Sequence, residues 1–570
     1  MLTHFSSFKL ILSLIGVIFF CNTHAQVTKL KDIVGEGKNG RYREDAFGRH
    51  IAITDDIIVV GVPYHDYDSN DSNYLSEAGA AFVFYKDEGG KDNWGLKKKL
   101  TATGKKARNT RDLFGISVAI FNDIIVVGAT DNGFDRNGEN EIYEAGAAFI
   151  FYKNEGGKDN WGQKTKIVAE GNGERSKQDF FGNSVAIFND IIVVCASYKE
   201  SGRNTNTGAA YIFYKDNGGT DNWGQKLKLF IDKSDSLAVD GGFGNSVDMS
   251  NDVIVISALK EGYDENAKNF VNGAGAVYVF NRNEGGTDNW GLKKKLIAKG
   301  PNARNQFDNF GFSLTISNDI IAVGAPNHCF DADGTNFASH AGAIYLYYRN
   351  EGGTDNWEQK LKLVAKEPMN RLFVDYFGGA IALSDYTLIA GVQNYDFDVN
   401  DANELRRAGA AFVFIKDNGG IDNWGLESKL TGSGNNGRKK EDVFGYEVAI
   451  SNKTIVVGIP NQSYDINGND SIKWAGKATI FKLGFPVGIT KTQKDNDISI
   501  GSEGKNIHFS FSTDEDYSIN VYDLMGREIV QTSSNKNLSQ TISLPNVATG
   551  YYLVKISQGY IQKAFKVYLQ

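Results

Sequence analysis

The fold is decided by a stretch in the first third of the chain. Residues 114–130 read FGISVAIFNDIIVVGAT, and residues 146–171 read GAAFIFYKNEGGKDNWGQKTKIVAEG. β-Branched and aromatic residues fill four short runs, and Gly, Asn or Asp residues separate the runs. We therefore expect four strands, at residues 116–121, 124–129, 147–153 and 164–168, which are joined by tight turns and one longer loop.

This unit recurs along the chain. A Phe-Gly dipeptide returns seven times with spacings of 67, 67, 62, 67, 67 and 67 residues, at Phe47, Phe114, Phe181, Phe243, Phe310, Phe377 and Phe444. A tryptophan stands 20 residues before six of these, at Trp94, Trp161, Trp223, Trp290, Trp357 and Trp424. A four-stranded unit with this period is typical of one blade of a β-propeller. The sequence therefore predicts an all-β protein with a seven-bladed propeller over residues 26–484.

The seventh unit stops after its third strand, at Phe481. The missing fourth strand has a counterpart at the other end of the chain, because residues 33–37 (IVGEG) match residues 167–171 (IVAEG) in register with the next Phe-Gly. We expect the N-terminal strand to complete blade seven, which would pair two otherwise exposed strand edges.

Several of these motifs carry a family resemblance. Residues 112–115 (DLFG), 126–129 (VVGA), 146–148 (GAA) and 324–326 (GAP) resemble the bacterial FG-GAP repeat family and its relative, the propeller of integrin α-chains. Integrin-type repeats hold calcium in a DxDxDG loop between their first two strands. Only a tight turn such as Asn122-Asp123 stands there in this chain, so the integrin metal site is not expected.

The two ends of the chain differ from the repeats. Residues 1–25 read as a signal peptide, because the apolar run Leu10–Phe20 follows Lys9 and Thr23-His24-Ala25 has small residues at the cleavage positions. Residues 485–495 read as a linker. Residues 496–570 contain about seven short alternating strands, which predict a small immunoglobulin-like β-sandwich.

The final segment also resembles a known module. Residues 521–529 (VYDLMGREI), the pair Leu544-Pro545 and residues 550–556 (GYYLVKI) resemble the C-terminal sorting domain of the type IX secretion system. The resemblance implies the type IX secretion machinery as a partner. It also implies export across the inner and outer membranes, so that the protein is secreted or lies at the cell surface. The alternative is an ordinary adhesion sandwich.

Bulk properties exclude two classes of partner. The net charge of −8 argues against a nucleic-acid binder, which needs a basic face. After residue 25 no stretch of about 18 apolar residues follows, so no transmembrane span is expected. Outside the proposed signal peptide the sequence has two cysteines, Cys195 and Cys329. They lie two repeats apart, so no disulfide is expected.

The loop between strands two and three carries the candidate metal site. In six units it reads aromatic-Asp-x-Asn/Asp-x-x-Asn/Asp, and its first two acidic or amide positions are Asp68 and Asn70, Asp135 and Asn137, Asp264 and Asn266, Asp331 and Asp333, Asp398 and Asn400, and Asp465 and Asn467. Such oxygens suit a weak Ca²⁺ site, since calcium takes six to eight hard oxygen ligands. They also cap tight turns. Most loops have one carboxylate, which favours capping.

Catalytic patterns are missing from the sequence. It has no GxSxG, HExxH or P-loop motif. His328 and His340 share a loop with Asp331 and Asp333 and could form a transition-metal site, but loop histidines are more often solvated. We therefore predict a non-enzymatic extracellular binding or adhesion protein, whose ligand is an unknown protein or glycan. The alternatives are a secreted enzyme for polysaccharide or peptide, with acids near the central channel, and a structural surface-layer component.

Overall fold

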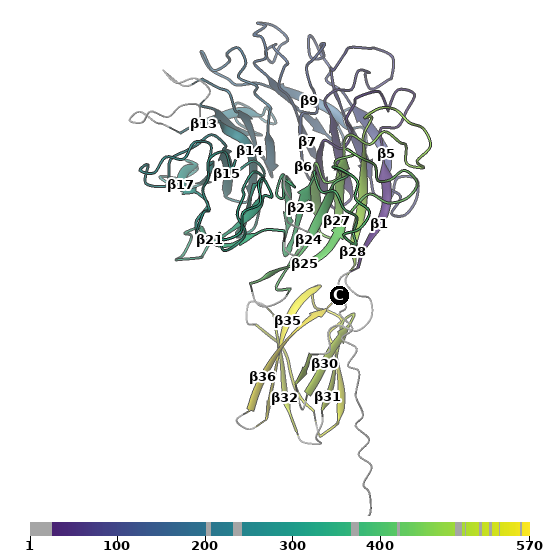
Figure 1. The fold of residues 1–570 in the computed structure, drawn as a ribbon, viewed down its shortest axis with the longest axis vertical. Helices are drawn as coiled ribbons and strands as arrows, with labels where there is room; N and C mark the ends of the chain where they lie inside the picture. Colours follow the sequence, from purple (N-terminus) through teal and green to yellow (C-terminus); the bar gives the residue numbers. More distant parts are fainter. Residues whose placement is uncertain are drawn as a thin grey trace, which may run out of the picture. The chain divides into compact units, whose positions relative to one another are not determined.

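The computed structural model describes residues 26–200, 207–231, 242–365, 375–418, 422–484, 493–495, 498–511, 516–523, 527–534, 536–558 and 561–569. The proposed signal peptide and most of the proposed linker lie outside these residues. The chain divides into two compact units, one of which is Val27–Leu483 and the other of which contains the residues from Gly484 onward. Every element in the described part is a β-strand, as Figure 1 shows.

The first unit consists of four-stranded antiparallel sheets, here called blades one to seven. Blade one comprises β2 (His50–Thr54), β3 (Ile57–Val62), β4 (Ala80–Tyr85) and β5 (Gly95–Leu100). Blade two comprises β6 (Ser117–Phe121), β7 (Ile124–Ala129), β8 (Ala147–Tyr152) and β9 (Gly162–Ile167). Blade three comprises β10 (Val185–Phe188), β11 (Ile191–Ala196), β12 (Ala209–Tyr214) and β13 (Gly224–Leu229).

The next three blades repeat this order. Blade four comprises β14 (Phe243–Ser250), β15 (Val253–Ala258), β16 (Ala276–Asn281) and β17 (Gly291–Leu296). Blade five comprises β18 (Leu314–Ser317), β19 (Ile320–Ala325), β20 (Ala343–Tyr348) and β21 (Glu358–Leu363). Blade six comprises β22 (Ala380–Ser384), β23 (Thr387–Val392), β24 (Ala410–Lys416) and β25 (Trp424–Leu430).

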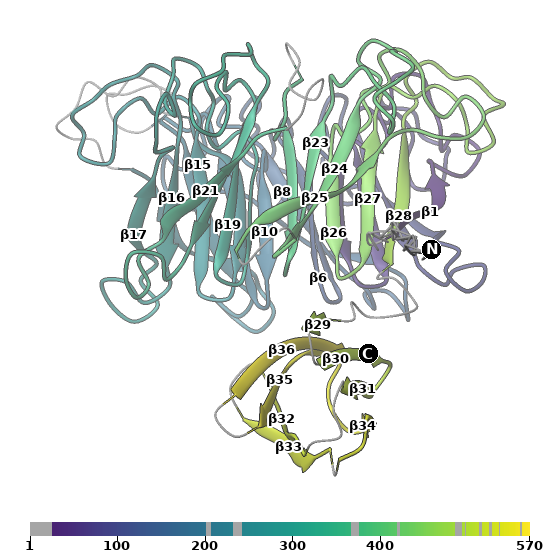
Figure 2. The ribbon, with the colours of Figure 1, turned by 60° about the horizontal axis from the view of Figure 1, so that its bottom comes forward.

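Blade seven is assembled from both ends of the unit. Its first three strands are β26 (Val448–Ser451), β27 (Thr454–Ile459) and β28 (Lys477–Gly484), and its fourth is β1 (Gln26–Ile33). Figures 1 and 2 show β1 beside β28. The first strand of each blade contacts the first strand of the next, and β26 contacts β2, so the order of blades closes on itself. The expected strand exchange is therefore present, although the strand ends at Ile33, where the matching motif begins.

Apolar side chains fill the space between neighbouring blades. One cluster contains Val59 and Val83 of blade one with Phe114 and Phe149 of blade two, and another joins blade seven to blade one. The glycine after each Phe lies close to the preceding blade: a Cβ on Gly115 (φ 99°) would stand 2.4 Å from the Ala80 carbonyl oxygen. Only glycine fits this close approach without strain, which explains the repeated Phe-Gly.

The recurring tryptophans also join blades. Each is at most 3% exposed, and four donate from Nε1 to a tyrosine hydroxyl of the preceding blade. The Nε1–Oη distances are 2.7–3.0 Å, for Trp161 to Tyr85, Trp223 to Tyr152, Trp290 to Tyr214 and Trp424 to Tyr348. The recurring tryptophans are therefore buried packing residues that join one blade to the next.

The second unit contains two further four-stranded sheets. One has the order β29 (Gln493–Asp495), β30 (Ile498–Glu503), β31 (Asn506–Phe511) and β34 (Ser539–Ser543). The other has the order β33 (Glu528–Ser533), β32 (Ser518–Tyr522), β35 (Gly550–Gln558) and β36 (Ile561–Leu569). All seven strands expected from the sequence are present, and their inward side chains form one apolar cluster. The eighth strand, β29, lies within the residues expected to form a linker, because residues 493–495 pair with β30.

Candidate functional site

Two ends of the propeller differ in the length of their connections. At one end lie the long loops from strand two to strand three and the segments that lead from strand four to the next Phe-Gly (Figure 2). Bridges such as Gly79 to Phe114 tie these segments together. We call this the loop end. The opposite end, which carries short turns such as Asn122-Asp123, is called the turn end.

In each of the six long loops, the aspartate that follows the aromatic residue accepts hydrogen bonds from the backbone of its own loop. Asp68 Oδ1 accepts the Asn70 N–H at 3.1 Å and the Ser72 N–H at 2.9 Å. Asp135, Asp264, Asp398 and Asp465 accept the N–H groups two and four residues further on in the same way. Asp331 accepts the Thr335 N–H at 2.8 Å. These contacts are the turn caps that the sequence allowed.

The second predicted ligand position behaves differently. Its residues contribute main-chain N–H groups to the turn in five loops, and their side chains are exposed in all six: Asn70, Asn137, Asn266, Asp333, Asn400 and Asn467. The oxygen Asp333 Oδ1 accepts from the Thr335 hydroxyl at 2.6 Å. The contact between the two predicted ligand positions is thus a hydrogen bond from the main-chain N–H of the second residue to the aspartate. The two side chains do not point at one common centre.

Hydrogen bonding stabilises the charged form of these carboxylates. In the blade-four loop, bonds led by the Lys268 N–H lower the pKa of Asp264 to about 2. In the blade-six loop, bonds led by the Asn403 side chain lower the pKa of Asp398. A carboxylate that accepts several N–H bonds stays ionised without a metal ion.

In the described part of the chain, an arginine from the following unit clamps five of the six acidic loops. Arg108 donates from Nη2 to the Asp66 carbonyl oxygen at 2.7 Å and from Nη1 to the Asn73 carbonyl oxygen at 3.2 Å. Asp68 interacts electrostatically with this guanidinium. The same clamp is made by Arg41, Arg175, Arg304 and Arg438. The third unit lacks the acidic loop and has Leu237 at the arginine position.

These contacts test the fit of calcium to the loops. Calcium needs six to eight oxygens, but the carboxylate oxygens already accept N–H groups and a guanidinium already supplies positive charge. Among the described residues, no three His, Cys, Asp or Glu side chains form a group that could hold a metal. The donor set therefore fits a clamped turn better than a calcium site, and calcium binding stays a prediction.

A second set of polar residues lies beside the Phe-Gly turns, and the sequence did not reveal its side-chain pairs. The aspartate two residues before Phe-Gly is buried and bonds a side chain 20 residues further on, as in Asp45 with His65 (3.1 Å) and Asp112 with Asn132 (2.9 Å). Further pairs are Asp179 with Lys199, Asp308 with His328 and Asp442 with Gln462. The constant 20-residue offset was visible in the sequence, but the changing partner hid the pair.

This pairing corrects the expectation that the blade-five histidines are solvated. His328 is fully buried and its Nδ1 lies 2.9 Å from Asp308. The His340 ring stacks on Tyr376, with 6.0 Å between centroids. Burial beside an acid, which the loop position did not reveal, gives His328 a structural partner. Cys195 and Cys329 are both free thiols, and Cys195 is buried.

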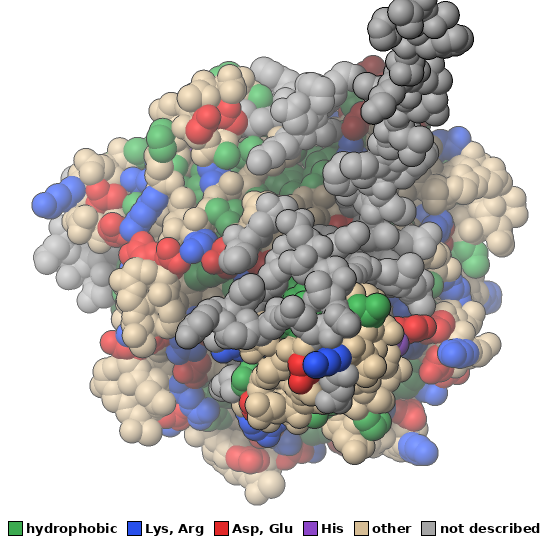
Figure 3. Space-filling view, turned by 90° about the horizontal axis from the view of Figure 1, so that it is seen from below, with side chains coloured by type: hydrophobic (Ala, Val, Ile, Leu, Met, Phe, Trp, Pro, Cys, Tyr) green, Lys and Arg blue, Asp and Glu red, His purple; other side chains and the backbone are tan. Residues whose placement is uncertain are grey.

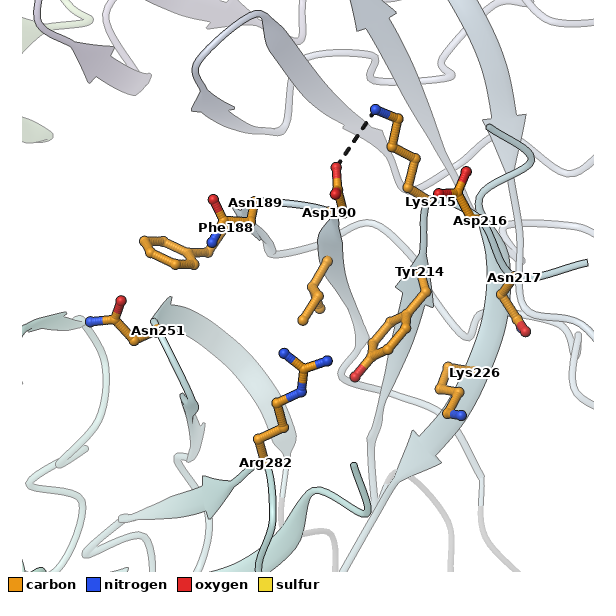
Figure 4. Close-up of a pocket in the computed structure, with 11 residues that line it drawn as sticks. Phe188, Asn189, Asp190, Tyr214, Lys215, Asp216, Asn217, Lys226, Asn251 and Arg282 are labelled. Carbon is orange, nitrogen blue, oxygen red and sulfur yellow. Dashed lines mark ion pairs between the residues drawn. The ribbon is translucent and has the colours of Figure 1, made fainter. Parts of the chain in front are cut away.

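Clefts at the turn end lie between neighbouring blades. Figure 4 shows one of about 420 Å³ between blades three and four, where Tyr214 and Lys215 face Phe188, Asp190 and Arg282. Lys215 pairs with Asp190 at 3.6 Å. A related cleft of about 680 Å³ lies between blades two and three. Because Tyr214 also accepts the Trp290 N–H, much of the cleft lining is framework that joins the blades.

Exposed aromatic side chains concentrate at the loop end. Of the aromatic residues of the described propeller that are more than a third exposed, only Tyr386 lies at the turn end. The others are Tyr42, Tyr74, Tyr143, Tyr198, Phe230, Phe270, Phe307, Phe312, Phe337 and Trp474. They vary between units: the position that is aromatic in Tyr74, Phe270 and Phe337 holds Glu141, Glu404 or Ser471 in the other long loops. On the face in Figure 3, acidic and basic side chains are interspersed.

Comparison with known proteins identifies two modules. The FG-GAP repeat model matches residues 94–151, 161–213, 223–280, 290–347 and 424–474. Each match begins at or near a recurring tryptophan, so one sequence repeat gives its first strand to the preceding blade. The model of the secretion system C-terminal sorting domain matches residues 503–570. No curated protein matches the chain.

Solved structures show more distant likenesses. The WD40 domain of Pan2 from Neurospora crassa is 10% identical, with a TM-score of 0.40, and the match covers 82% of this chain and 98% of that one. Hsv2 from Kluyveromyces lactis is 10% identical (TM-score 0.33, 66% and 83% covered). A DUF3244 family protein with an immunoglobulin-like β-sandwich fold from Bacteroides vulgatus is 19% identical (TM-score 0.12, 14% and 94% covered). Values this low say nothing about function.

Proposed function

Because the chain carries FG-GAP repeats followed by a secretion system C-terminal sorting domain, we propose that it is a non-enzymatic binding or adhesion protein whose loop end contacts an extracellular ligand. The sorting domain indicates export to the cell surface or secretion, which makes the secretion machinery a partner. No helix in the described part of the chain is long and apolar enough to span a membrane.

The observation that carries this proposal is the distribution of exposed aromatic residues. The capped and clamped loops form a repeated framework, and the aromatic side chains that vary between units stand on it. Rigid loops that present large, variable side chains are typical of recognition surfaces. Aromatic rings bind well because they bury a large area and lose little side-chain entropy.

The test compares the two ends of the propeller. The variant Phe270→Ser/Phe307→Ser/Phe337→Ser removes three of the exposed loop-end aromatic residues around blades four and five, and Tyr386→Ser is the turn-end control. Both are applied to an array of bacterial polysaccharides and extracellular matrix proteins. We expect the triple variant to lose roughly tenfold or more in affinity, while the control binds as the wild type does. Equal binding by all three proteins would contradict a loop-end site.

One observation favours a second candidate, a secreted hydrolase. Glu447 precedes β26 and His50 begins β2, and both stand at a position where the other units have serine or alanine. Burial raises the pKa of Glu447 to about 8, which suits a general acid. An enzyme needs residues that break the repeat in this way. Hydrolysis of a polysaccharide or peptide that is abolished by Glu447→Gln would favour this candidate over binding alone.

A further inference from the structure

The fourth strand of each ordinary blade is held by the same side-chain pair. A lysine of strand four lies opposite an aromatic residue of strand three, with 5.4–5.9 Å between the ammonium and the ring centroid. The pairs are Lys99 with Phe82, Lys166 with Phe149, Lys228 with Tyr211, Lys295 with Tyr278, Lys362 with Tyr345 and Lys429 with Phe412. Such cation–π contacts are favourable where solvent is largely excluded.

Blade seven replaces this pair by another. Asp32, in β1, stands 67 residues before Lys99 and takes the place of the lysine. Thr479, in β28, stands 67 residues after Phe412 and takes the place of the aromatic ring. Lys477 stands 67 residues after Ala410, at a position where the six other blades have alanine. In blade seven the lysine therefore stands in strand three instead of strand four, an acid occupies the usual lysine position, and a threonine hydroxyl replaces the aromatic ring.

The three replacements contact one another in the interior. Lys477 Nζ lies 3.1 Å from Asp32 Oδ2, and the Thr479 hydroxyl donates to Asp32 Oδ1 at 2.7 Å. Asp32 is 7% exposed, Lys477 2% and Thr479 3%. A buried ion pair adds little net stability over an apolar pair, but a buried charge without its partner is strongly destabilising. The ion pair of Asp32 and Lys477 therefore destabilises pairing of β28 with a wrong fourth strand more than it stabilises pairing with β1.

We propose that the buried ion pair of Asp32 and Lys477 selects the N-terminal strand, among seven similar fourth strands, as the one that closes the propeller. Any other fourth strand would bring its lysine against Lys477 and bury two like charges. In another blade, Asp32 would face an aromatic ring and alanine, and it would lose its buried cation Lys477 and keep only the partly exposed Lys29 of its own strand, which lies 3.1 Å away. The correct pair joins residues that are 445 positions apart in the sequence, and repeats this alike are prone to pair wrongly or exchange strands.

The first experiment measures how well the strand is held. Trypsin is added to the mature full chain, and release of the N-terminal peptide by cleavage at Lys29 or Lys31 is followed by mass spectrometry. Asp32→Lys and Lys477→Asp should each speed release roughly tenfold or more, and the double variant should restore protection. Lys362→Ala, at the matching position of blade five, should leave release unchanged. If Asp32→Lys does not fold, Asp32→Asn tests the same contact. Wild-type release from every variant would overturn the proposal.

The second experiment separates selection from stabilisation. Asp32→Lys/Lys477→Ala/Thr479→Phe gives blade seven the pattern of the ordinary blades. The closed monomer of this variant should melt as the wild type does. After dilution from urea, however, its yield of closed monomer should fall at least twofold, with the remainder as oligomers or as chains whose N-terminal strand is cleavable. A wild-type yield would show that the pair does not select the strand, and would overturn the proposal.

Discussion

Blade seven and the six blades before it have the same four-stranded sheet, yet different side chains hold their outer strand. The ordinary blades use a lysine against an aromatic ring, whereas blade seven uses Asp32, Lys477 and Thr479. The junction from blade seven to blade one also lacks the tyrosine found in blades one, two, three and five, because Lys482 stands in its place, as Asn281 does in blade four. Blades that are continuous in sequence share the same side-chain contact from one repeat to the next. The contact between β1 and β28, which come from the two ends of the propeller, occurs in blade seven alone.

The largest effect should come from removing the closing strand. Deletion of residues 27–37 opens blade seven and exposes the edge of β28, so we expect the melting temperature of the propeller to fall by roughly 10 °C or more. Deletion of residues 496–570 should leave the propeller transition within about 2 °C of its value in the mature chain. Calorimetry of both truncated proteins provides the measurement. Equal melting temperatures would contradict ring closure by β1.

The buried aspartates should give the next largest effect. Burial raises the pKa of Asp112 in blade two to about 6 and that of Asp442 in blade seven to about 7. Because the folded-state values exceed the unfolded value of about 4, each stabilising contribution is complete below about pH 4 and is lost as the pH rises to the folded-state pKa. The free energy of unfolding should therefore fall between pH 4 and 7, by on the order of 1 kcal/mol for each group.

Substitution distinguishes the two positions. Asp442→Asn should flatten the pH dependence up to about pH 7, and Asp112→Asn only up to about pH 6. Urea titrations at intervals of half a pH unit measure the slopes. Wild-type slopes in both variants would show that these carboxylates do not take up protons on folding.

A smaller effect should come from supplying the missing tyrosine. Trp94 Nε1 is buried without a hydrogen-bond partner in the described part of the chain, since Lys482 replaces the tyrosine found in blades one, two, three and five. Lys482→Tyr would offer a hydroxyl to Trp94 and should raise stability by about 1 kcal/mol. Tyr85→Phe, which removes the bond from Trp161 Nε1, should lower it by a similar amount. In urea unfolding, the two variants should therefore change the free energy of unfolding in opposite directions. A loss of stability in both would show that a tyrosine at position 482 does not form the bond to Trp94.

The smallest effect should be that of calcium on the acidic loops. The arginine clamp and the N–H bonds already satisfy the aspartates, so raising calcium from zero to about 10 mM should change the melting temperature by less than about 1 °C. Arg438→Leu, which copies the third unit, should lower it even with calcium present. A saturable rise with calcium that chelation reverses and Asp331→Ala reduces would instead show occupied metal sites.

The repeat made much of the fold predictable. Each Phe-Gly and each buried tryptophan recurs at a fixed spacing, and these residues mark positions where the geometry admits few substitutes, as at Gly115. The exchange of the N-terminal strand followed from the same spacing. The strand boundaries shifted by a few residues, since turns and strand ends use similar residues.

The candidate site was less predictable because its contacts join residues that vary. The partner of the buried aspartate changes from His65 to Asn132 to Lys199, so a search for constant motifs passes over it. The clamping arginines do recur every 67 residues, and Leu237 marks the one unit without the acidic loop. The joint absence of the acidic loop and the arginine in one unit could have predicted from the sequence that the two contact each other. Which aromatic side chains are exposed depended on tertiary packing, which spacing does not encode.

Hydrogen exchange of the mature full chain tests the central claim most directly. In a closed ring, the amides of residues 27–33 exchange only when blade seven opens, so their protection should match that of β9 and β13, the fourth strands of ordinary blades. The same amides should lose protection in Asp32→Lys while β9 and β13 keep theirs. Exchange of residues 27–33 at the rate of a free terminus in the wild type would contradict closure by this strand.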